Sequence, residues 1–437
     1  MDWSVVGIIF SLAFIVVLAL RGWHIIVIAP LAVVIVSILS QMNIMETMTG
    51  PYMKGFTNYA GKFYLIFLAG SLFGKFMEDG QAARSIANGI LRVTGRESPM
   101  RVMLAIAIVS LCLTYGGVSL FVVIFAVIPI SRPLFKEMNL PWHLWLAPFA
   151  FGGSSLTMTM LPGSPQIQNI IPTKYLASTT YSAPLVGLTG AVVVIIFNLL
   201  YFRYILRKSK ERGETYEDPP AGVLGAGAAA SGPTPNIFLS LVPPIVVLIL
   251  LNFNIPYIKR DAVVALVGGV LSCIILFWKY YPNVVDSLTK GALNTVVPVV
   301  NTCADVGYGM AVAATNGFKL VSSWLLAIPG HPVISLAIAT NIMAAITGSA
   351  SGGLGIIMET LVPKYVAMGV SPDLIHRIAA MASGGFDAMP HNGVVITTLA
   401  VAGLTHRNAY KHLFFGHVIA DTLGLIAAIP VGIWIYG

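Results

Sequence analysis

Residues 383–393 read SGGFDAMPHNG and set glycine, proline and two ionisable side chains, Asp387 and His391, between apolar stretches. Proline and glycine interrupt helices, and an apolar segment has no packing need for an acid or an imidazole. A helix that breaks inside a bilayer frees backbone groups that lipid cannot satisfy, so the break is buried in protein or lines a cavity. The segment therefore predicts a broken membrane helix beside a polar cavity.

Three other segments have the same character. Each combines glycine, which lets the backbone turn, with hydroxyl groups that can bind a solute or a freed carbonyl group. Small residues also allow close helix packing, which would explain any one segment alone. Their paired recurrence in the two halves of the chain favours solute binding. The segments are TYGGVS (residues 114–119), TGSASGG (347–353), and GGSS (152–155) running on to PGSP (162–165).

The rest of the chain has the composition of a polytopic membrane protein. Of 437 residues, 57% are hydrophobic and only 10% are charged, whereas about a quarter of a soluble chain is charged. The fold class expected is all-α, and the first apolar stretch is expected to stay as a helix because no basic region precedes it. Stretches near the bilayer-spanning length of about 20 residues occur at Trp3–Leu20, Trp23–Ser40, Ala183–Phe202, Ala262–Trp278 and Leu413–Tyr436.

The net charge and the cysteines exclude several classes of protein. The formal net charge of +8 comes with basic clusters within residues 84–101 and 203–212, which are typical of cytoplasmic loops and do not require nucleic acid as a partner. The three cysteines, Cys112, Cys273 and Cys303, fit neither a disulfide framework nor a metal site by number and spacing. We expect no cofactor and no metal, with membrane lipid as the surroundings.

A polar stretch at residues 207–235 is predicted to be a flexible cytoplasmic linker between two transmembrane repeats, 1–206 and 236–437. Features of the first repeat recur in the same order about 232 residues later, as expected for a secondary transporter. The basic clusters fit an odd number of spans per half, which makes the repeats inverted. The matched features are Gly74 with Gly307, Thr114 with Thr347, Pro129 with Pro363, Pro141 with Pro372, and Gly152-Gly153 with Gly384-Gly385.

The helix ends at these breaks are candidates for binding a carboxylate. Half-helix N-termini carry partial positive charge and free N–H groups, so they can hold an anion without a dedicated arginine. We expect the carboxylate against residues 116–119 and 347–351, and a solute hydroxyl against Ser154 or Ser155. The predicted substrate-binding residues are Gly116, Gly117, Ser119, Gly153, Ser154, Ser155, Thr347, Gly348, Ser349, Ser351, Gly384, Gly385 and Asn392.

Asp387 and His391 are the predicted proton-coupling residues. A coupling group must change its charge near the working pH, which a buried aspartate or a histidine can do. Asp387 aligns with Ser155 of the first half, so the second half has an acid where the first has a hydroxyl. The alternative is that Asp387 caps the next half-helix and His391 only packs. His417 could pair with Asp421, four residues later on one helix face.

These segments together resemble the gluconate permease family of membrane carriers. The resemblance rests on residues 72–79 (LFGKFMED), 82–87 (AARSIA), 347–350 (TGSA) and the Gly384-Gly385 and Pro390-His391-Asn392 motifs. It implies proton-coupled uptake of small organic acids across a bacterial inner membrane. It also implies two inverted repeats, each with a re-entrant hairpin and a broken helix, and a homodimer.

Residues 158–165 (MTMLPGSP) lack the histidines that sugar-acid members of that family have there. This departure resembles the branch for short hydroxy-acids, so 3-hydroxybutyrate is expected before gluconate. A sodium-coupled carrier or a sodium/proton antiporter is the nearest rival. A membrane-embedded enzyme using Asp387 and His391 is a remote one, because the sequence has no nucleotide-binding loop, nucleophile motif or metal-ligand set, and no catalytic residue is predicted.

Overall fold

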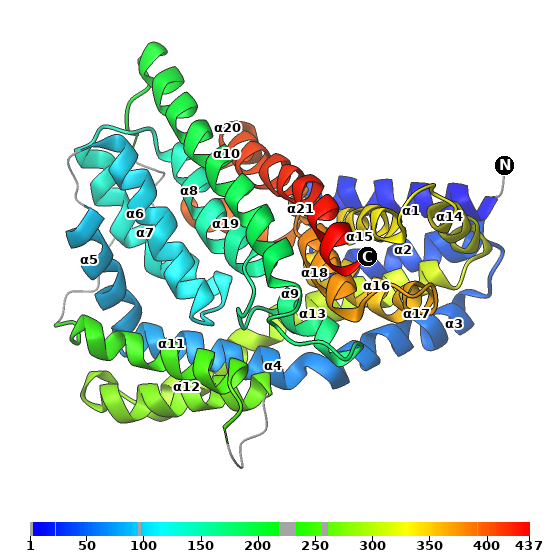
Figure 1. The fold of residues 1–437 in the computed structure, drawn as a ribbon, viewed down its shortest axis with the longest axis horizontal. Coiled ribbons are helices and arrows are strands. Elements are labelled where there is room, and N and C mark those ends of the chain that lie inside the picture. Colours follow the sequence, from blue (N-terminus) through cyan, green and yellow to red (C-terminus); the bar gives the residue numbers. More distant parts are fainter. Residues whose placement is uncertain (1–2, 22, 95–97, 218–232, 256–260, 391) are drawn as a thin grey trace.

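A computed structural model describes residues 3–21, 23–94, 98–217, 233–255, 261–390 and 392–437 of the chain (Figure 1). The described chain is folded mainly as helices. In the first half these are α1 (Trp3–Leu20), α2 (Ile25–Leu39), α3 (Ile44–Thr47), η1 (Met48–Tyr52), α4 (Met53–Asp79), α5 (Ala82–Thr94), α6 (Pro99–Tyr115), α7 (Leu120–Glu137), η2 (Trp142–Trp145), α8 (Leu146–Ala150), η3 (Phe151–Met160), α9 (Ile167–Ile170), η4 (Ile171–Lys174) and α10 (Pro184–Glu211).

The second half is also helical throughout most of its described residues. Its helices are α11 (Ile237–Asn252), α12 (Ala262–Phe277), η5 (Trp278–Tyr280), α13 (Val284–Ala313), α14 (Asn316–Leu326), α15 (Pro332–Thr347), α16 (Ala350–Thr360), α17 (Val362–Ala367), α18 (Pro372–Ser383), η6 (Phe386–Ala388), α19 (Gly393–Ala402), α20 (His406–Leu413), η7 (Phe414–Ile419) and α21 (Ala420–Tyr436).

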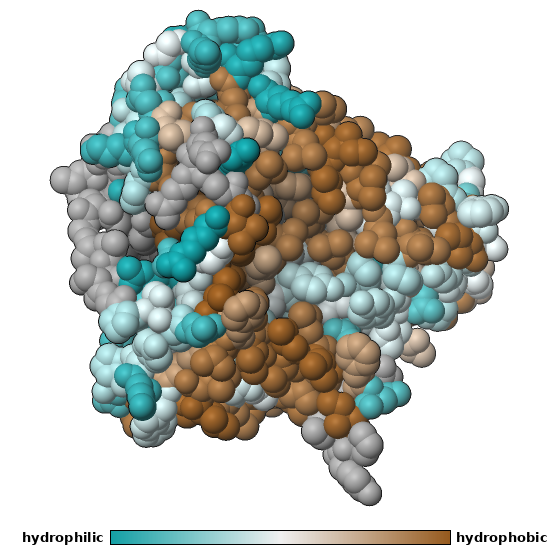
Figure 2. All heavy atoms as spheres, turned by 60° about the vertical axis from the view of Figure 1, so that its left-hand side comes forward, coloured by the Kyte–Doolittle hydropathy of each residue, from teal (hydrophilic) through white to brown (hydrophobic). Residues whose placement is uncertain are grey.

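The predicted apolar stretches form helices that suit a bilayer. Within the described residues, four continuous helical runs are long and apolar enough to cross a membrane: Pro184–Glu211, Ala262–Tyr280, Val284–Ala313 and His406–Tyr436. Shorter apolar helices, among them α1, α2, α6 and α15, add to them. Figure 2 shows hydrophobic side chains over much of one face, with hydrophilic side chains gathered at its top and left edges. The all-α, polytopic fold class predicted from composition is confirmed.

Equivalent helices of the two halves pack against each other in antiparallel fashion. Along α4 and α13, Gly55 lies against Met310, Ser71 donates a hydrogen bond to the Gly291 carbonyl, and Asp79 accepts one from Ser287. Residue numbers rise along α4 as they fall along α13, so the two helices run antiparallel. Helices α10 and α21 also pack antiparallel. Such pairs follow from a two-fold axis perpendicular to the helices, as in inverted repeats.

The first two helices of each half pack on helices of the other half. Helices α1 and α2 of the first half pack on α14 and α13, whereas α11 and α12 of the second half pack on α5 and α4 (Figure 1). Neither half forms a separate body. Helix α10 continues through Glu211 into the segment predicted as a linker, and residues 218–232 of that segment lie outside the described residues.

Each half contains a helical hairpin and an interrupted helix. The hairpins are α6–α7 and α15–α16, whose tips turn at Gly117 and Gly348, with φ angles of +97° and +58°. The interruptions are at residues 161–166 and 384–392. Gly152 and Gly153 correct one detail of the prediction, because they continue a helix, η3, instead of breaking it. A side chain at Gly152 would collide with the Ala107 carbonyl of α6, so the small residue there serves close packing.

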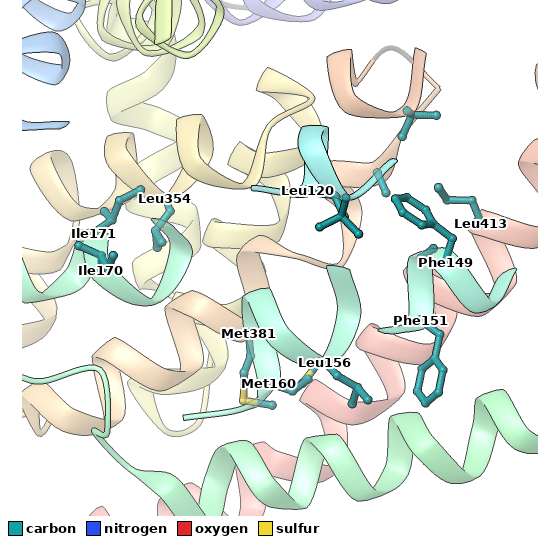
Figure 3. Close-up of a cluster of buried hydrophobic side chains, with 14 of the residues drawn as sticks. Leu120, Phe149, Phe151, Leu156, Met160, Ile170, Ile171, Leu354, Met381 and Leu413 are labelled. Atoms are coloured by element: carbon teal, nitrogen blue, oxygen red, sulfur yellow. The ribbon is translucent and has the colours of Figure 1, made fainter. Parts of the chain in front are cut away.

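Apolar side chains fix these segments in place (Figure 3). Met160, at the end of η3, and Met381, on α18, both lie against Gly190 of α10. Leu120, Phe149 and Leu413 are close to one another at the wall of a cavity (Figure 3). The core therefore holds the interrupted helices of both halves around a common space.

Candidate functional site

A cavity of about 700 Å³ lies among the two hairpin tips and the two interrupted helices. Its wall includes Gly117 and Ser119 from one tip, Gly348 and Ser349 from the other, and Asp387 from the second interruption. Segments separated by more than half of the chain therefore meet around one space, as the four glycine-rich segments predict.

Three helix N-termini reach this cavity. Helices α7, α16 and α19 begin after Ser119, Ser349 and Asn392, and all three of these N-cap residues line the wall. The Ser349 side chain accepts a hydrogen bond from Gly352 N–H, and the Asn392 side chain accepts from Val394 N–H. Each N-terminus brings a partial positive charge and N–H groups that lack an intrahelical acceptor. The wall thereby favours an anion.

His417 connects the acids of the site. Its Nε2 lies 3.3 Å from Asp387 Oδ1, and its Nδ1 lies 2.6 Å from Ser155 Oγ and 3.7 Å from Asp421 Oδ2. The His417 side chain is only 4% exposed and that of Asp421 is fully buried, while Asp387 is 16% exposed and lines the cavity with His417. A chain of polar contacts therefore leads from the cavity into the protein.

The inner end of this chain is held by hydroxyl groups. Thr159 donates a hydrogen bond to Asp421 Oδ2 at 3.3 Å, while Asp421 Oδ1 is buried without a hydrogen-bond partner among the described residues. If both carboxylates are ionised and the imidazole is protonated, Asp387, His417 and Asp421 together carry one negative charge. One more proton makes the group neutral, so gain or loss of a proton changes the net charge at a buried place.

Two π-helical segments bring these partners together. Ser154 and Ser155 are in η3, which is π-helical from Phe151 to Met160, and His417 is in η7, which is π-helical from Phe414 to Ile419. Short π-helical insertions occur frequently at functional sites because they shift the side chains that follow. Here two of them face each other across the Ser155–His417 hydrogen bond.

Much of the remaining wall is apolar. Leu120, Phe149, Met158 and Leu413 line it beside the polar groups. Lys75 also lines the cavity, but its ammonium group is paired with Asp79 at 2.8 Å and with Glu78 at 3.3 Å.

The cavity wall includes many of the residues predicted to bind substrate, and others lie behind it. Gly116 packs on Pro244, Gly153 on Leu120, Gly384 on Thr159 and Gly385 on Asn341, while Ser155 reaches the site through His417. His391 lies outside the described residues. The predicted residues in the wall are Gly117, Ser119, Ser154, Thr347, Gly348, Ser349, Ser351, Asp387 and Asn392.

Two features of the site have no counterpart in the predicted set. The imidazole that contacts Asp387 is that of His417, which lies in another helix. The sequence signal for His417 is its position four residues before Asp421 on one helix face. The predicted pairing is present, with His417 Nδ1 3.7 Å from Asp421 Oδ2. Asp305 and Asn301 of α13 also line the cavity.

Comparisons with known proteins agree on a transporter. A model of a family described as citrate transporter, CitMHS, matches residues 12–300. The uncharacterised transporter YxjC of Bacillus subtilis is 34% identical over 98% of both chains. An uncharacterised transporter of Haemophilus influenzae is 24% identical over 84% of both chains.

Two solved structures have a similar fold. The YdaH transporter of Alcanivorax borkumensis aligns with a TM-score of 0.57 over 90% of this chain and 88% of that one, at 15% identity. MtrF of Neisseria gonorrhoeae, described as illuminating a class of antimetabolite efflux pumps, aligns with a TM-score of 0.54 over 90% and 85%, at 14% identity. At these identities the likeness concerns the fold alone.

Proposed function

The chain belongs to the citrate transporter family CitMHS, and on that premise we propose that it imports a small hydroxy-carboxylate together with protons. The family and the relatives are transporters, so the chain is a secondary transporter of the bacterial inner membrane and not an enzyme of that membrane. The substrate and the coupling ion are the parts proposed here.

The convergence of three helix N-termini on one cavity carries the proposal. A carboxylate placed before α7, α16 and α19 faces three partial positive charges and needs no arginine. The Ser119 side chain accepts no hydrogen bond from α7, and Ser154 also lines the wall. These two hydroxyls are suited to an anion and to a substrate hydroxyl.

Proton coupling is assigned to Asp387 with His417. Asp387 faces the cavity and His417 leads inward to Ser155 and Asp421. A proton taken up by this buried group reduces its negative charge and so favours an anionic substrate in the adjacent cavity. Release of the proton reverses that preference, which links the two fluxes.

The apolar part of the wall supports the proposed substrate class. A polyol such as gluconate needs a partner for each hydroxyl, because each buried unpaired one costs about 1–3 kcal/mol. Leu120, Phe149 and Met158 supply none. A methyl-terminated hydroxy-acid, 3-hydroxybutyrate, suits this wall better. Citrate is the second candidate, because the matching family is described by that substrate and the cavity of about 700 Å³ is larger than a short acid requires.

Uptake into proteoliposomes tests this function. With an inward proton gradient and no sodium, the protein should concentrate labelled 3-hydroxybutyrate, and a protonophore should abolish accumulation. Excess unlabelled 3-hydroxybutyrate should compete more strongly than gluconate. Accumulation that depends on sodium and ignores the protonophore would refute proton coupling. Stronger competition by citrate would transfer the assignment to the second candidate.

The resemblance to gluconate permeases and its short hydroxy-acid branch stays a prediction, because the family model that matches is that of citrate transporters. The homodimer implied by that resemblance stays a prediction too.

A further inference from the structure

Helix α13 presents two acceptor groups to the cavity that the proton-coupled mechanism does not use. Asp305 is only 7% exposed, and its carboxylate has no hydrogen bond or ion pair with any described residue. Asn301 lies one turn earlier on the same face, and its Oδ1 is buried without a hydrogen-bond partner in the described chain. Both residues line the cavity wall.

The tip of the second hairpin lies close to Asp305. The Cα of Gly352 faces the acid so closely that a methyl group there would be 3.2 Å from Asp305 Cβ. The hydroxyls of Ser349 and Ser351 at this tip are 3.4 Å apart and also line the cavity. Carboxylate, amide and hydroxyl oxygens therefore line the same cavity.

The fold itself does not require these polar groups. The equivalent helix of the first half, α4, has Leu68 and Leu72 at the positions that correspond to Asn301 and Asp305. Helices α4 and α13 pack on each other, and Leu72 lies against Gly291 of α13, so this position of the repeat can hold an apolar side chain. A buried ionised carboxylate without a partner is unfavourable, and proteins keep such groups protonated, paired or bound to cations.

We propose that Asn301, Asp305 and the hairpin tip at Ser349 and Ser351 form a sodium site. One carboxylate with neutral oxygens balances one positive charge, whereas divalent and transition metals prefer several anionic or imidazole ligands. Among the described residues, no group of three or more His, Cys, Asp and Glu is placed to hold a metal ion. This site contains neither Asp387 nor His417, but it shares the Ser349 tip with the proposed carboxylate position, so sodium binding is measured on the substrate-free protein.

Sodium binding at this site can be measured from the Tm of the purified, substrate-free protein in detergent. Sodium chloride should raise the Tm by about 3 °C or more at saturation, while potassium or choline chloride at equal ionic strength should not. In Asp305→Asn the apparent sodium affinity should fall at least tenfold, and Asn301→Ala should weaken it by less. Asp286→Asn is the matched control, because Asp286 lies on the same helix, pairs with Lys290 at 2.7 Å and is 51% exposed.

Direct binding of radioactive sodium to the same four proteins provides a second readout if a variant unfolds early. No sodium-specific shift or binding in the wild-type protein would overturn the proposal, and so would an unchanged affinity in a folded Asp305→Asn protein. Proton-driven uptake by wild-type protein in sodium-free buffer distinguishes these failures from failure of the proposed function, because uptake there reports on Asp387 and His417 alone.

Discussion

The two interrupted helices of this transporter occupy equivalent places in the two halves and have different chemistry. At the first, residues 161–166, the adjacent polar groups are neutral hydroxyls such as Ser154 and Ser155. At the second, residues 384–392, Asp387 faces the cavity and meets His417. The duplication therefore supplies a symmetric frame, while the ionisable groups are concentrated on one side of it. Under the proposed function, the second half is specialised for proton coupling while the frame keeps the pseudo-symmetry used in alternating access.

Loss of the Asp387 charge should have the largest effect. Asp387→Asn removes the group that faces both the cavity and His417, so uphill accumulation driven by a proton gradient should fall about 100-fold or more. Exchange of labelled for unlabelled substrate at equal concentrations should persist, because the helix N-termini are intact. If Asp387→Asn still accumulated substrate at the wild-type level, Asp387 would not be the coupling residue and the two halves would not differ in coupling.

Replacement of His417 should have the next largest effect. His417→Gln retains hydrogen-bonding capacity toward Asp387 and Ser155 but cannot carry the proton, so accumulation should fall about 10- to 100-fold. The pH dependence of uptake should flatten, which a purely structural role would not cause. A variant with a reduced rate and an unchanged pH profile would assign His417 to positioning alone.

The hairpin tips should differ in their tolerance of substitution. Gly117 has a φ of +97° and a methyl group there would lie 3.1 Å from Pro165, whereas Gly348 has a φ of +58°, which asparagine tolerates. Gly117→Asn should therefore lose about 1–2 kcal/mol of stability, and Gly348→Asn less than half of that. The Tm of each purified variant in detergent measures this. Equal losses would mean that the tips are conformationally alike.

Replacing the two serines of η3 should have the smallest effects on the uptake rate. Ser155 lies 2.6 Å from His417 Nδ1, whereas Ser154 lies 3.3 Å from it and already donates to the Ala150 carbonyl. Ser155→Ala should reduce the uptake rate about two- to tenfold, the value of one hydrogen bond of about 0.5–1.5 kcal/mol. Ser154→Ala should change it less than about twofold. The initial rate of uptake at saturating substrate separates them, and a larger effect at Ser154 would reverse the assignment.

Much of the frame could be predicted because local chemistry determines it. Glycine and proline at a constant spacing predicted helix breaks in both halves, the family resemblance implied the hairpins, and apolar length predicted the spanning helices. The π-helical backbone of Gly152 and Gly153 could not be predicted, because it depends on close contact with Ala107 of another helix. The partner of Asp387 could not be predicted either, since His417 reaches it only through tertiary packing of η7.

The exchange of first helices between the halves has a consequence for biogenesis. Helices α1 and α2 are synthesised first, but the surfaces of α13 and α14 that receive them follow roughly 250 residues later, which at a synthesis rate of about 5–20 residues per second is about 10–50 s. During that interval α1 and α2 wait in the membrane without their final neighbours. The order of insertion therefore differs from the order of assembly, and a ribosome that stalls midway leaves behind a half-chain that lacks its own counterpart.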